Sequence, residues 1–140
     1  MTAVGDQVIL EDSGEQSLNL AGIGAGPEES QALRLTAFSE NTNLIPSPVV
    51  EYISASATGT LRYQPLPDAH GTVTLKVVVE DGGFDNDLAT SGDNASFTTS
   101  FLVTVSPVND PPTLDPISDI TIDEDAPERT VSLGGITAGQ

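Results

Sequence analysis

The chain of 140 residues carries 4 Lys and Arg residues against 21 Asp and Glu residues, a formal net charge of −17. This charge disfavours nucleic acid as a partner, because phosphate groups are bound by cationic surfaces, and it disfavours anionic membranes for the same reason. The absence of cysteine excludes disulfides, thiolate metal ligands and thiol catalysis. No apolar run approaches the roughly 20 residues of a membrane helix, so direct membrane insertion is not expected. Two explanations of the acidity remain: solubility, and the binding of divalent cations by clustered oxygen ligands.

Short runs of alternating apolar residues, separated by turns rich in Gly, Pro and Asn, predict strands and no helix. The predicted strands are 7–10, 17–20, 33–37, 49–53, 61–65, 72–80 and 95–105. The last two alternate most strongly, and we expect them to pair as a hairpin and supply much of the core. Their inward-facing residues are predicted to be Val73, Leu75, Val77 and Val79, and Phe97, Thr99, Phe101, Val103 and Val105. This pattern predicts an all-β fold, an antiparallel β-sandwich of about seven strands with immunoglobulin-like architecture.

An internal repeat with a period of 113 residues organises the chain. Residues 124–139 align without a gap on residues 11–26 and are identical at 8 of the 16 positions, and Ile122 matches Ile9 just upstream. Such agreement predicts a true tandem repeat. The expected organisation is a complete repeat at 1–106, a proline-rich linker at 107–116 and the truncated start of the next repeat at 117–140, a slice of a longer array.

The apolar residues of the segment 117–140 have no core of their own. They are Ile117, Ile120, Ile122, Val131 and Leu133. Three alternatives are open for the segment: it is disordered, it folds back, or it docks on a neighbouring molecule where the homologous first strands normally lie. Docking of this last kind is head-to-tail and could form chains.

Several short motifs carry a resemblance to a known family. One begins at Val79 and reads Val-Glu-Asp-Gly-Gly, and another begins at Val105 and reads Val-Ser-Pro-Val-Asn-Asp-Pro-Pro. Together they resemble the bacterial cadherin-like and Ig-like tandem repeats of large surface and secreted proteins. The resemblance implies an extracellular or cell-surface location and a non-enzymatic role in spacing, stiffening and adhesion. It implies neighbouring repeats of the same protein as partners, together with homotypic or cell-surface partners. The alternative is a module that binds carbohydrate or protein through its loops.

Cadherin-type repeats bind calcium (Ca²⁺) at their junctions, and the resemblance transfers this role to four positions. Glu11 matches the Glu that ends the first strand region, Asn109 and Asp110 match the linker Asn-Asp, and Asp81 matches the Asp before a Gly near the end of the penultimate strand. Asp68 stands at the place of the family's intermediate acidic motif. Pro107 and Pro111 replace further expected ligands, so the resemblance implies one ion rather than three. The alternative for 109–111 is a turn with an Asx hydrogen bond.

The loop 81–94 is the second candidate cation site. Asp85 and Asp87 are weaker candidate ligands, and the alternative is a solvated loop, because the spacing departs from that of a calcium loop. Asn94 opens an N-glycosylation triplet. His70, the only histidine, is predicted to be a turn residue, and Lys76, the only lysine, is predicted to point to solvent.

Overall fold

The computed structural model describes residues 1–27 and 29–139, so Glu28 and Gln140 lie outside the described residues. The chain divides into two compact units, Met1–Val108 and Asn109–Gln140. The division falls inside the segment 107–116 that was predicted as a linker. No helix occurs in the described part of the chain, and therefore none of it forms a helix long and apolar enough to cross a membrane.

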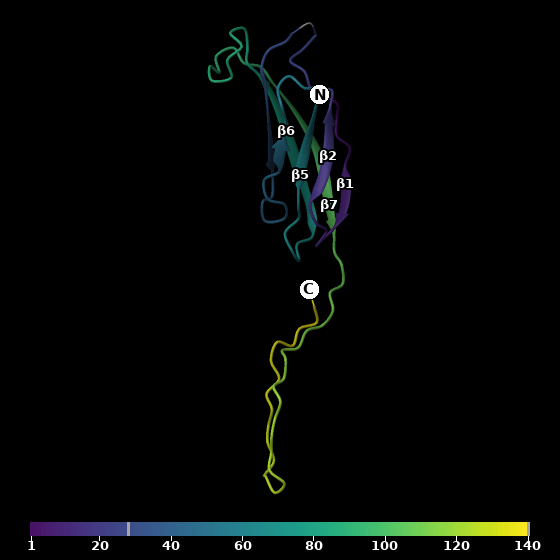
Figure 1. Ribbon diagram of the computed structural model, residues 1–140. Coiled ribbons are helices and arrows are strands. Elements are labelled where there is room, and N and C mark those ends of the chain that lie inside the picture. Colours follow the sequence, from purple (N-terminus) through teal and green to yellow (C-terminus); the bar gives the residue numbers. More distant parts are fainter. Residues whose placement is uncertain (28, 140) are drawn as a thin grey trace. The chain divides into compact units, whose positions relative to one another are not determined.

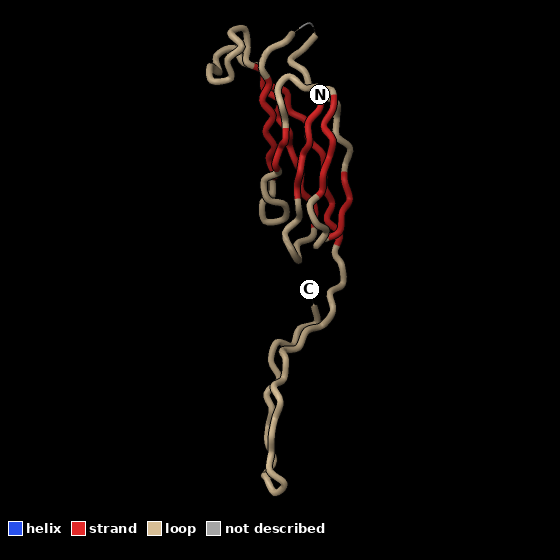
Figure 2. Tube along the Cα trace, viewed as in Figure 1, coloured by secondary structure: helices blue, strands red, loops and turns tan. Residues whose placement is uncertain are grey.

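The first unit contains seven strands in two sheets. Figures 1 and 2 show how these strands run along the unit. The strands are β1 (Gln7–Leu10), β2 (Gln16–Ala21), β3 (Leu33–Ser39), β4 (Val49–Glu51), β5 (Thr58–Tyr63), β6 (Gly71–Asp81) and β7 (Ser96–Ser106). One sheet has the order β1-β7-β6-β3 and the other the order β2-β5-β4. All neighbours are antiparallel except β1 and β7, which run parallel. The predictions of an all-β fold and of about seven strands in two layers are confirmed.

The hairpin of β6 and β7 supplies the centre of the core, as predicted. Its register places Val73 opposite Val103 and Leu75 opposite Phe101, and all four side chains are buried. Successive side chains of a strand point to opposite faces, so the alternation of Val and Thr on β6 places one apolar face inward. Phe97 differs from the prediction, since its side chain is 54% exposed. Its partner on β6, Val79, is buried, but β1 pairs only with residues 103–106 of β7, so β7 is the edge strand of its sheet at Phe97.

Aliphatic side chains from both sheets form one core, with few aromatic residues. The buried hydrophobic residues include Leu20, Leu35, Leu61 and Val77, which come from four different strands. Tyr63 from β5 packs edge-on against Phe101 from β7, with ring centroids 6.4 Å apart. Edge-to-face contact is a favoured arrangement because the ring edge is positive and the ring face negative.

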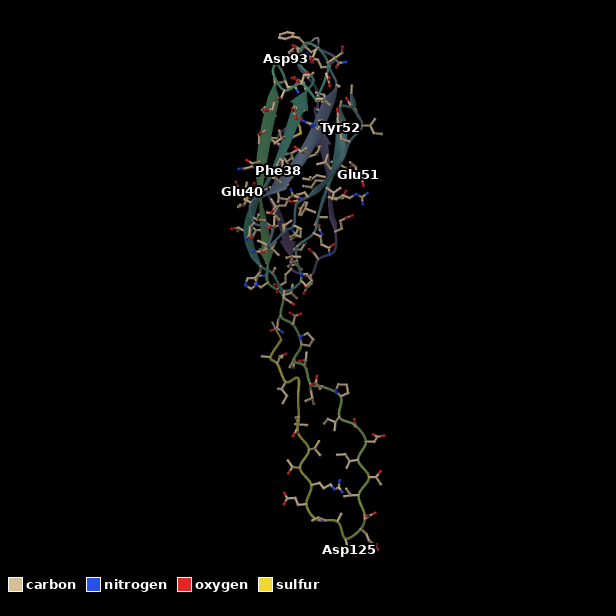
Figure 3. All side chains as sticks on the ribbon, turned by 90° about the vertical axis from the view of Figure 1, so that its left-hand side faces the viewer. Phe38, Glu40, Glu51, Tyr52, Asp93 and Asp125 are labelled. Carbon is tan, nitrogen blue, oxygen red and sulfur yellow. The ribbon has the colours of Figure 1, made fainter. Side chains whose placement is uncertain are left out.

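The outer faces carry most of the charge. Lys76 points to solvent, as predicted, and its Nζ lies 2.5 Å from a carboxylate oxygen of Glu40. Arg62 on β5 contacts both Glu15 and Glu51. In Figure 3, Glu40 marks the four-stranded sheet and Glu51 the three-stranded sheet on the other side of the core. Exposed pairs of this kind stabilise a fold by less than about 1 kcal/mol each.

The chain enters the sandwich at one end and leaves it at the opposite end. Figure 1 shows the N-terminus at the end that carries the β6–β7 loop. Near that end, Thr2 N donates a hydrogen bond to Ala21 O at 2.8 Å. β7 begins at this end and carries the chain to the other one, where Ser106 O accepts from Glu11 N at 2.9 Å. Eleven residues of strand at about 3.3 Å each give a sandwich roughly 36 Å long.

The second unit consists of two extended arms joined by a turn. Thr113 and Thr137 form an isolated antiparallel bridge between the arms, and their side-chain oxygens lie 2.8 Å apart. Asp115 N donates to Gly134 O at 2.9 Å. Few other backbone hydrogen bonds join the described residues of the two arms, so this unit is a loosely paired hairpin.

The backbone contacts of the arms repeat those of residues 1–26. The hydrogen bond from Asp115 to Gly134 is the counterpart, 113 positions later, of the bond from Thr2 to Ala21. The next residue, Gly22 in the first unit and Gly135 in the second, has a φ of +64° in both. Glycine adopts this left-handed conformation without the steric cost that a Cβ brings.

The turns of the two segments also correspond. In the first unit Ser13 N donates to Leu10 O at 3.3 Å, and in the second Ala126 N donates to Asp123 O at 3.1 Å, again 113 positions later. Asp125 lies at the turn of the second unit in Figure 3. The internal repeat seen in the sequence is therefore also a repeat of backbone hydrogen bonds and of turn positions.

Candidate metal centres

Glu11 is a buried carboxylate at the end where the chain leaves the sandwich. Its exposed fraction is 3%, and it is the only polar or charged residue in the buried set of the described residues. Glu11 Oε1 accepts a hydrogen bond from Val108 N at 2.6 Å. The sequence alone left open whether Glu11 reaches this end, and the parallel pairing of β1 with β7 answers it. Glu11 anchors the first residues that follow β7.

His70 contacts the other oxygen of the same carboxylate. His70 Nδ1 lies 3.2 Å from Glu11 Oε2, and the histidine side chain is 61% exposed. The residue lies in the turn before β6, as predicted, but the contact with Glu11 was not predicted. It joins positions 59 residues apart, and no local sequence pattern indicates such a distance. Burial of a carboxylate costs free energy unless it is hydrogen-bonded, and these two contacts give each oxygen of Glu11 a polar partner.

Asp12 and Asp68 form an acidic pair beside Glu11 in the first unit. Both have left-handed backbones, with φ of 57° and 56°. Asp68 N donates to Asp12 Oδ1 at 3.2 Å, and oxygens of the two carboxylates lie within 4.8 Å of each other. Asp68 was a weak candidate from the resemblance, whereas Asp12 was not predicted. The signal that could have identified Asp12 is its identity with Asp125 in the repeat.

Asn109 and Asp110, two of the predicted calcium ligands, belong to the second unit. Asn109 Nδ2 donates to Asp110 O at 3.2 Å, a local bond between consecutive residues. In an Asx turn the side-chain oxygen accepts from the backbone two residues on, whereas here the amide nitrogen donates. The structure assigns no turn at 109–111, so this contact is not the Asx hydrogen bond of the alternative.

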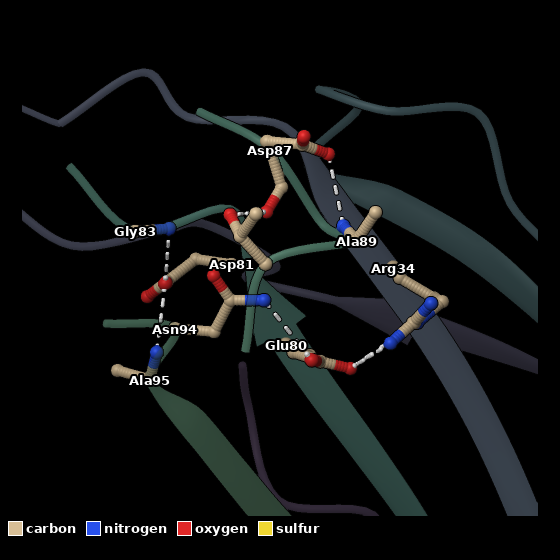
Figure 4. Close-up of polar contacts among 9 residues, drawn as sticks. Arg34, Glu80, Asp81, Gly83, Asp87, Ala89, Asn94 and Ala95 are labelled. Carbon is tan, nitrogen blue, oxygen red and sulfur yellow. Dashed lines mark hydrogen bonds and ion pairs between the residues drawn. The ribbon is translucent and has the colours of Figure 1, made fainter. Parts of the chain in front are cut away.

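Asp81, the fourth predicted ligand, lies at the opposite end of the sandwich from Glu11. Its backbone N donates to Ala95 O at 3.0 Å, just before β7 begins. Asp81 Oδ1 accepts from Gly83 N at 3.0 Å and from Ala95 N at 2.9 Å (Figure 4). Calcium–oxygen distances are about 2.3–2.6 Å, so two groups separated by the length of β7 cannot share an ion within one sandwich. Through these hydrogen bonds Asp81 joins the two ends of the β6–β7 loop.

The other carboxylates of the β6–β7 loop accept hydrogen bonds from donors within the same loop. Asp85 Oδ1 accepts from Asp87 N at 2.9 Å, and Asp85 Oδ2 accepts from the Thr90 hydroxyl at 2.6 Å. The hydrogen bond from Thr90 and that from the Asp87 backbone lower the pKa of Asp85. Asp87 Oδ1 accepts from Ala89 N at 2.9 Å, as Figure 4 shows. Among the described loop residues, no three carboxylates come within 4.8 Å of one another.

Asn94, the residue that opens the glycosylation triplet, makes a polar contact with β6. Asn94 Nδ2 donates to Glu80 Oε1 at 3.3 Å, and Arg34 Nη2 lies 2.5 Å from Glu80 Oε2 (Figure 4). The hydrogen bond from Arg34, followed by that from Asn94, lowers the pKa of Glu80. The Asn94 amide is thus turned toward β6 and half-buried rather than presented to solvent.

Comparison of the chain with protein-family models, curated proteins and solved structures finds no match.

Proposed function

We propose that the chain is a non-enzymatic structural repeat of the bacterial cadherin-like and Ig-like class, which spaces and stiffens a large extracellular or cell-surface protein. The strand order supports the class, because an immunoglobulin-like sandwich also places the last two strands beside the third and packs the second, fifth and fourth strands against them. The motif that begins at Val79 lies at the end of β6, and the motif that begins at Val105 starts in β7 and continues into the linker. Neighbouring repeats of the same protein are the proposed partners.

One observation carries the proposal: the chain enters the sandwich at one end, leaves it at the other, and then resumes the same pattern. Thr2 pairs with Ala21 near the entry end, and Asp115 makes the equivalent bond to Gly134 after the exit. A domain with this geometry adds its full length, roughly 36 Å, for each copy in an array. A spacer needs this property, whereas a domain with both termini at one end extends an array much less.

The residues that follow β7 favour a stiff connection. Glu11 holds Val108 through a hydrogen bond of 2.6 Å, so the chain is anchored as it leaves the sandwich. Pro107, Pro111 and Pro112 come on either side of the anchored residues. Each proline ring fixes its own φ and biases the preceding residue toward extended conformations. An extended and restricted linker transmits orientation from one repeat to the next.

Calcium at the exit end is part of the same proposal. Asp12 and Asp68 offer carboxylate oxygens within 4.8 Å of each other, next to Glu11. Calcium takes six to eight oxygens, which these carboxylates, backbone carbonyls and water can supply together. Asp81, at the entry end, is then a ligand for the junction with a preceding repeat.

Thermal unfolding in EDTA, followed by a Ca²⁺ titration with Mg²⁺ as control, tests the calcium part. A ligand that binds the native state raises the unfolding midpoint as its concentration exceeds the dissociation constant. We expect a saturable rise selective for Ca²⁺, which is lost in the Asp12→Asn/Asp68→Asn variant. The matched control, Asp85→Asn/Asp87→Asn, changes two loop carboxylates and keeps the rise. A rise that survives in Asp12→Asn/Asp68→Asn, or no rise in the wild type, contradicts the exit-end site.

The spacer role has a test of its own that does not depend on calcium. Small-angle scattering of a tandem protein with two complete copies of the repeat measures the maximum dimension. A spacer predicts an increase of roughly one sandwich length plus the linker over the single copy. A dimension close to that of a side-by-side pair contradicts the spacer role.

A second function, binding of a protein through the loops, is favoured by Phe84. Its side chain is 97% exposed in the β6–β7 loop, while Phe84 N is held by Asp93 Oδ2 at 2.7 Å. Exposed aromatic residues on ordered loops are typical of binding surfaces. Binding to a cell-surface protein that falls when Phe84 is replaced by Ser, and persists when the exposed Phe38 is replaced, supports this second function.

A further inference from the structure

Residues 114–139 present an uncovered apolar face whose counterpart in the first unit is covered. The alignment by 113 positions pairs five apolar residues of the arms with five residues that pack in the sandwich. The pairs are Ile117 with Val4, Ile122 with Ile9, Val131 with Leu18, Leu133 with Leu20, and Ile136 with Ile23. Leu20 is 1% exposed and Leu133 is 53% exposed. The same pattern is therefore core in one place and surface in the other.

The arms form a groove rather than a closed surface. A depression of about 480 Å³ lies between them, and its lining includes Ile117, Ile120, Val131 and Leu133. Isolated hydrophobic residues on a surface are ordinary, but a contiguous apolar face bounded by polar residues marks a place of contact. A two-stranded hairpin is also only marginally stable in water without something to pack against.

The first unit shows which surface fits this face. There, residues 1–26 lie against β5 and β7, with Leu18 opposite Leu61 on β5 and Ile9 opposite Val105 on β7. The equivalent residues of the arms carry the same apolar positions, the same backbone bond to residue 134 and the same glycine conformation at residue 135. The surface that covers residues 1–26 is therefore complementary to residues 114–139 as well.

We infer that residues 114–139 of one molecule can replace residues 1–26 in the sandwich of a second copy of this chain. β1 and β2 are consecutive in the sequence, so they can leave the sandwich together and be replaced together. The contact is head-to-tail, because the donor segment and the acceptor sandwich are different surfaces, and repetition of the contact forms open chains. This inference goes beyond the spacer role and does not require it.

The balance between the two segments decides how much exchange occurs. In the wild type the acceptor site is already filled by residues 1–26, so exchange replaces one apolar segment by a similar one and gains little. Every copy is also strongly acidic, with a net charge of −17, and the repulsion between copies opposes association at low salt. Weakening residues 1–26 while leaving the arms intact shifts the balance toward exchange.

Matched alanine variants of the full chain test this balance. Leu20→Ala weakens the resident segment, Leu133→Ala weakens the donor, and the double variant weakens both. Sedimentation from micromolar to submillimolar concentration measures the mass in added salt. We expect Leu20→Ala to reach at least about twice the monomer mass, with an unfolding midpoint that rises with concentration. Leu133→Ala stays monomeric, and the double variant loses the association of Leu20→Ala.

A disulfide trap identifies the contact, since the chain has no cysteine of its own. Val8 pairs with Thr104, and the residue equivalent to Val8 in the arms is Thr121. In the Leu20→Ala background, one molecule carries Thr104→Cys and the other Thr121→Cys, and exchange predicts a mixed disulfide dimer. Thr98→Cys is the control for Thr104→Cys, because Thr98 pairs with Val78 instead of β1.

The outcomes separate exchange from other kinds of association. A Leu20→Ala variant that is folded and monomeric at every concentration overturns the inference. Equal association of the double variant overturns it as well, because the exposed core would then drive the contact. A Thr121→Cys homodimer without the mixed dimer indicates that the arms pair with each other and also contradicts it. If Leu20→Ala does not fold, Leu18→Ala, with Val131→Ala as the donor control, provides the same test with a milder change.

Discussion

Residues 1–26 and residues 114–139 are two copies of one pattern in different surroundings. Both have a backbone bond that closes the segment, a turn that contains Glu-Asp, and a glycine with a φ of +64°. The apolar residues of the first copy pack within the sandwich of their own unit, whereas the equivalent residues of the second unit are exposed. The comparison shows that local sequence determines the path of the backbone, while burial depends on the rest of the repeat.

Equivalent substitutions in the two copies test this difference in burial. The leucine pair has the largest expected effect. Leu20→Ala removes a side chain that is 1% exposed, which typically costs about 2–5 kcal/mol of unfolding free energy in a packed core. Leu133→Ala removes a side chain that is 53% exposed and is expected to change the free energy by less than about 0.5 kcal/mol. Denaturant unfolding at low micromolar protein, where the chain is monomeric, measures both. Equal losses contradict the account.

The glutamate pair comes next. Glu11→Ala leaves Val108 N without its acceptor in a buried place, and this is expected to cost about 1–3 kcal/mol. Glu124→Ala, at the equivalent exposed position of the second unit, is expected to leave the unfolding free energy unchanged. Glu11→Gln keeps an oxygen for Val108 N and serves as the conservative control. A Glu11→Ala variant as stable as the wild type shows that the anchor does not stabilise the fold.

The glycine pair has a smaller expected effect. Gly22→Ala places a Cβ in a left-handed conformation, 2.5 Å from Thr2 Oγ1, and a loss of about 1–2 kcal/mol is expected from the backbone strain. Gly135→Ala strains the same conformation in the arms, outside the sandwich core, so the unfolding transition of the sandwich stays where it is. Calorimetry of both variants measures the difference. A shift of the sandwich transition in Gly135→Ala indicates that the arms are part of its cooperative unit.

The smallest expected effect is the response of the sandwich to acid. Hydrogen bonds from Lys76 and Arg34 lower the pKa of Glu40 and Glu80 below the ordinary value of 4.5. A lowered folded pKa means that the stabilisation is complete above about pH 4.5 and is lost as the pH falls through the folded pKa. Unfolding midpoints measured from about pH 6 down to about pH 3 should therefore fall less steeply in Glu80→Gln. Identical slopes contradict the contribution of Glu80.

Much of the fold was predictable because it depends on local alternation. The β6 pattern places Val73, Leu75 and Val77 on one face whatever their partners are, and the structure buries that face. Phe97 could not be predicted in the same way, since its exposure depends on how far the neighbouring strand β1 extends, and β1 pairs only with residues 103–106 of β7. The alternation along a strand predicts which face a side chain lies on, but it does not predict whether neighbouring strands cover that side chain.

The exit-end site was less predictable, for a related reason. Glu11 was identified through the resemblance, but its contacts join distant parts of the sequence, including His70 at a separation of 59 residues. Asp12 was missed although its repeat copy is identical, because an acidic residue in a turn is usually only solvated. The loop carboxylates Asp85 and Asp87 were considered as ligands, and in the structure their oxygens accept hydrogen bonds from local backbone and hydroxyl donors.

Hydrogen exchange at equivalent backbone amides is the most direct test of the claim that burial, and not the shared backbone pattern, stabilises the first copy. The amides of Thr2 and Asp115 make equivalent bonds of 2.8 Å and 2.9 Å. At low protein concentration we predict that Thr2 exchanges slowly, through opening of the sandwich, and that Asp115 exchanges nearly as fast as an unstructured peptide. Similar protection of both amides in the monomer would contradict the account, because the second copy would then be stable without a sandwich to cover it.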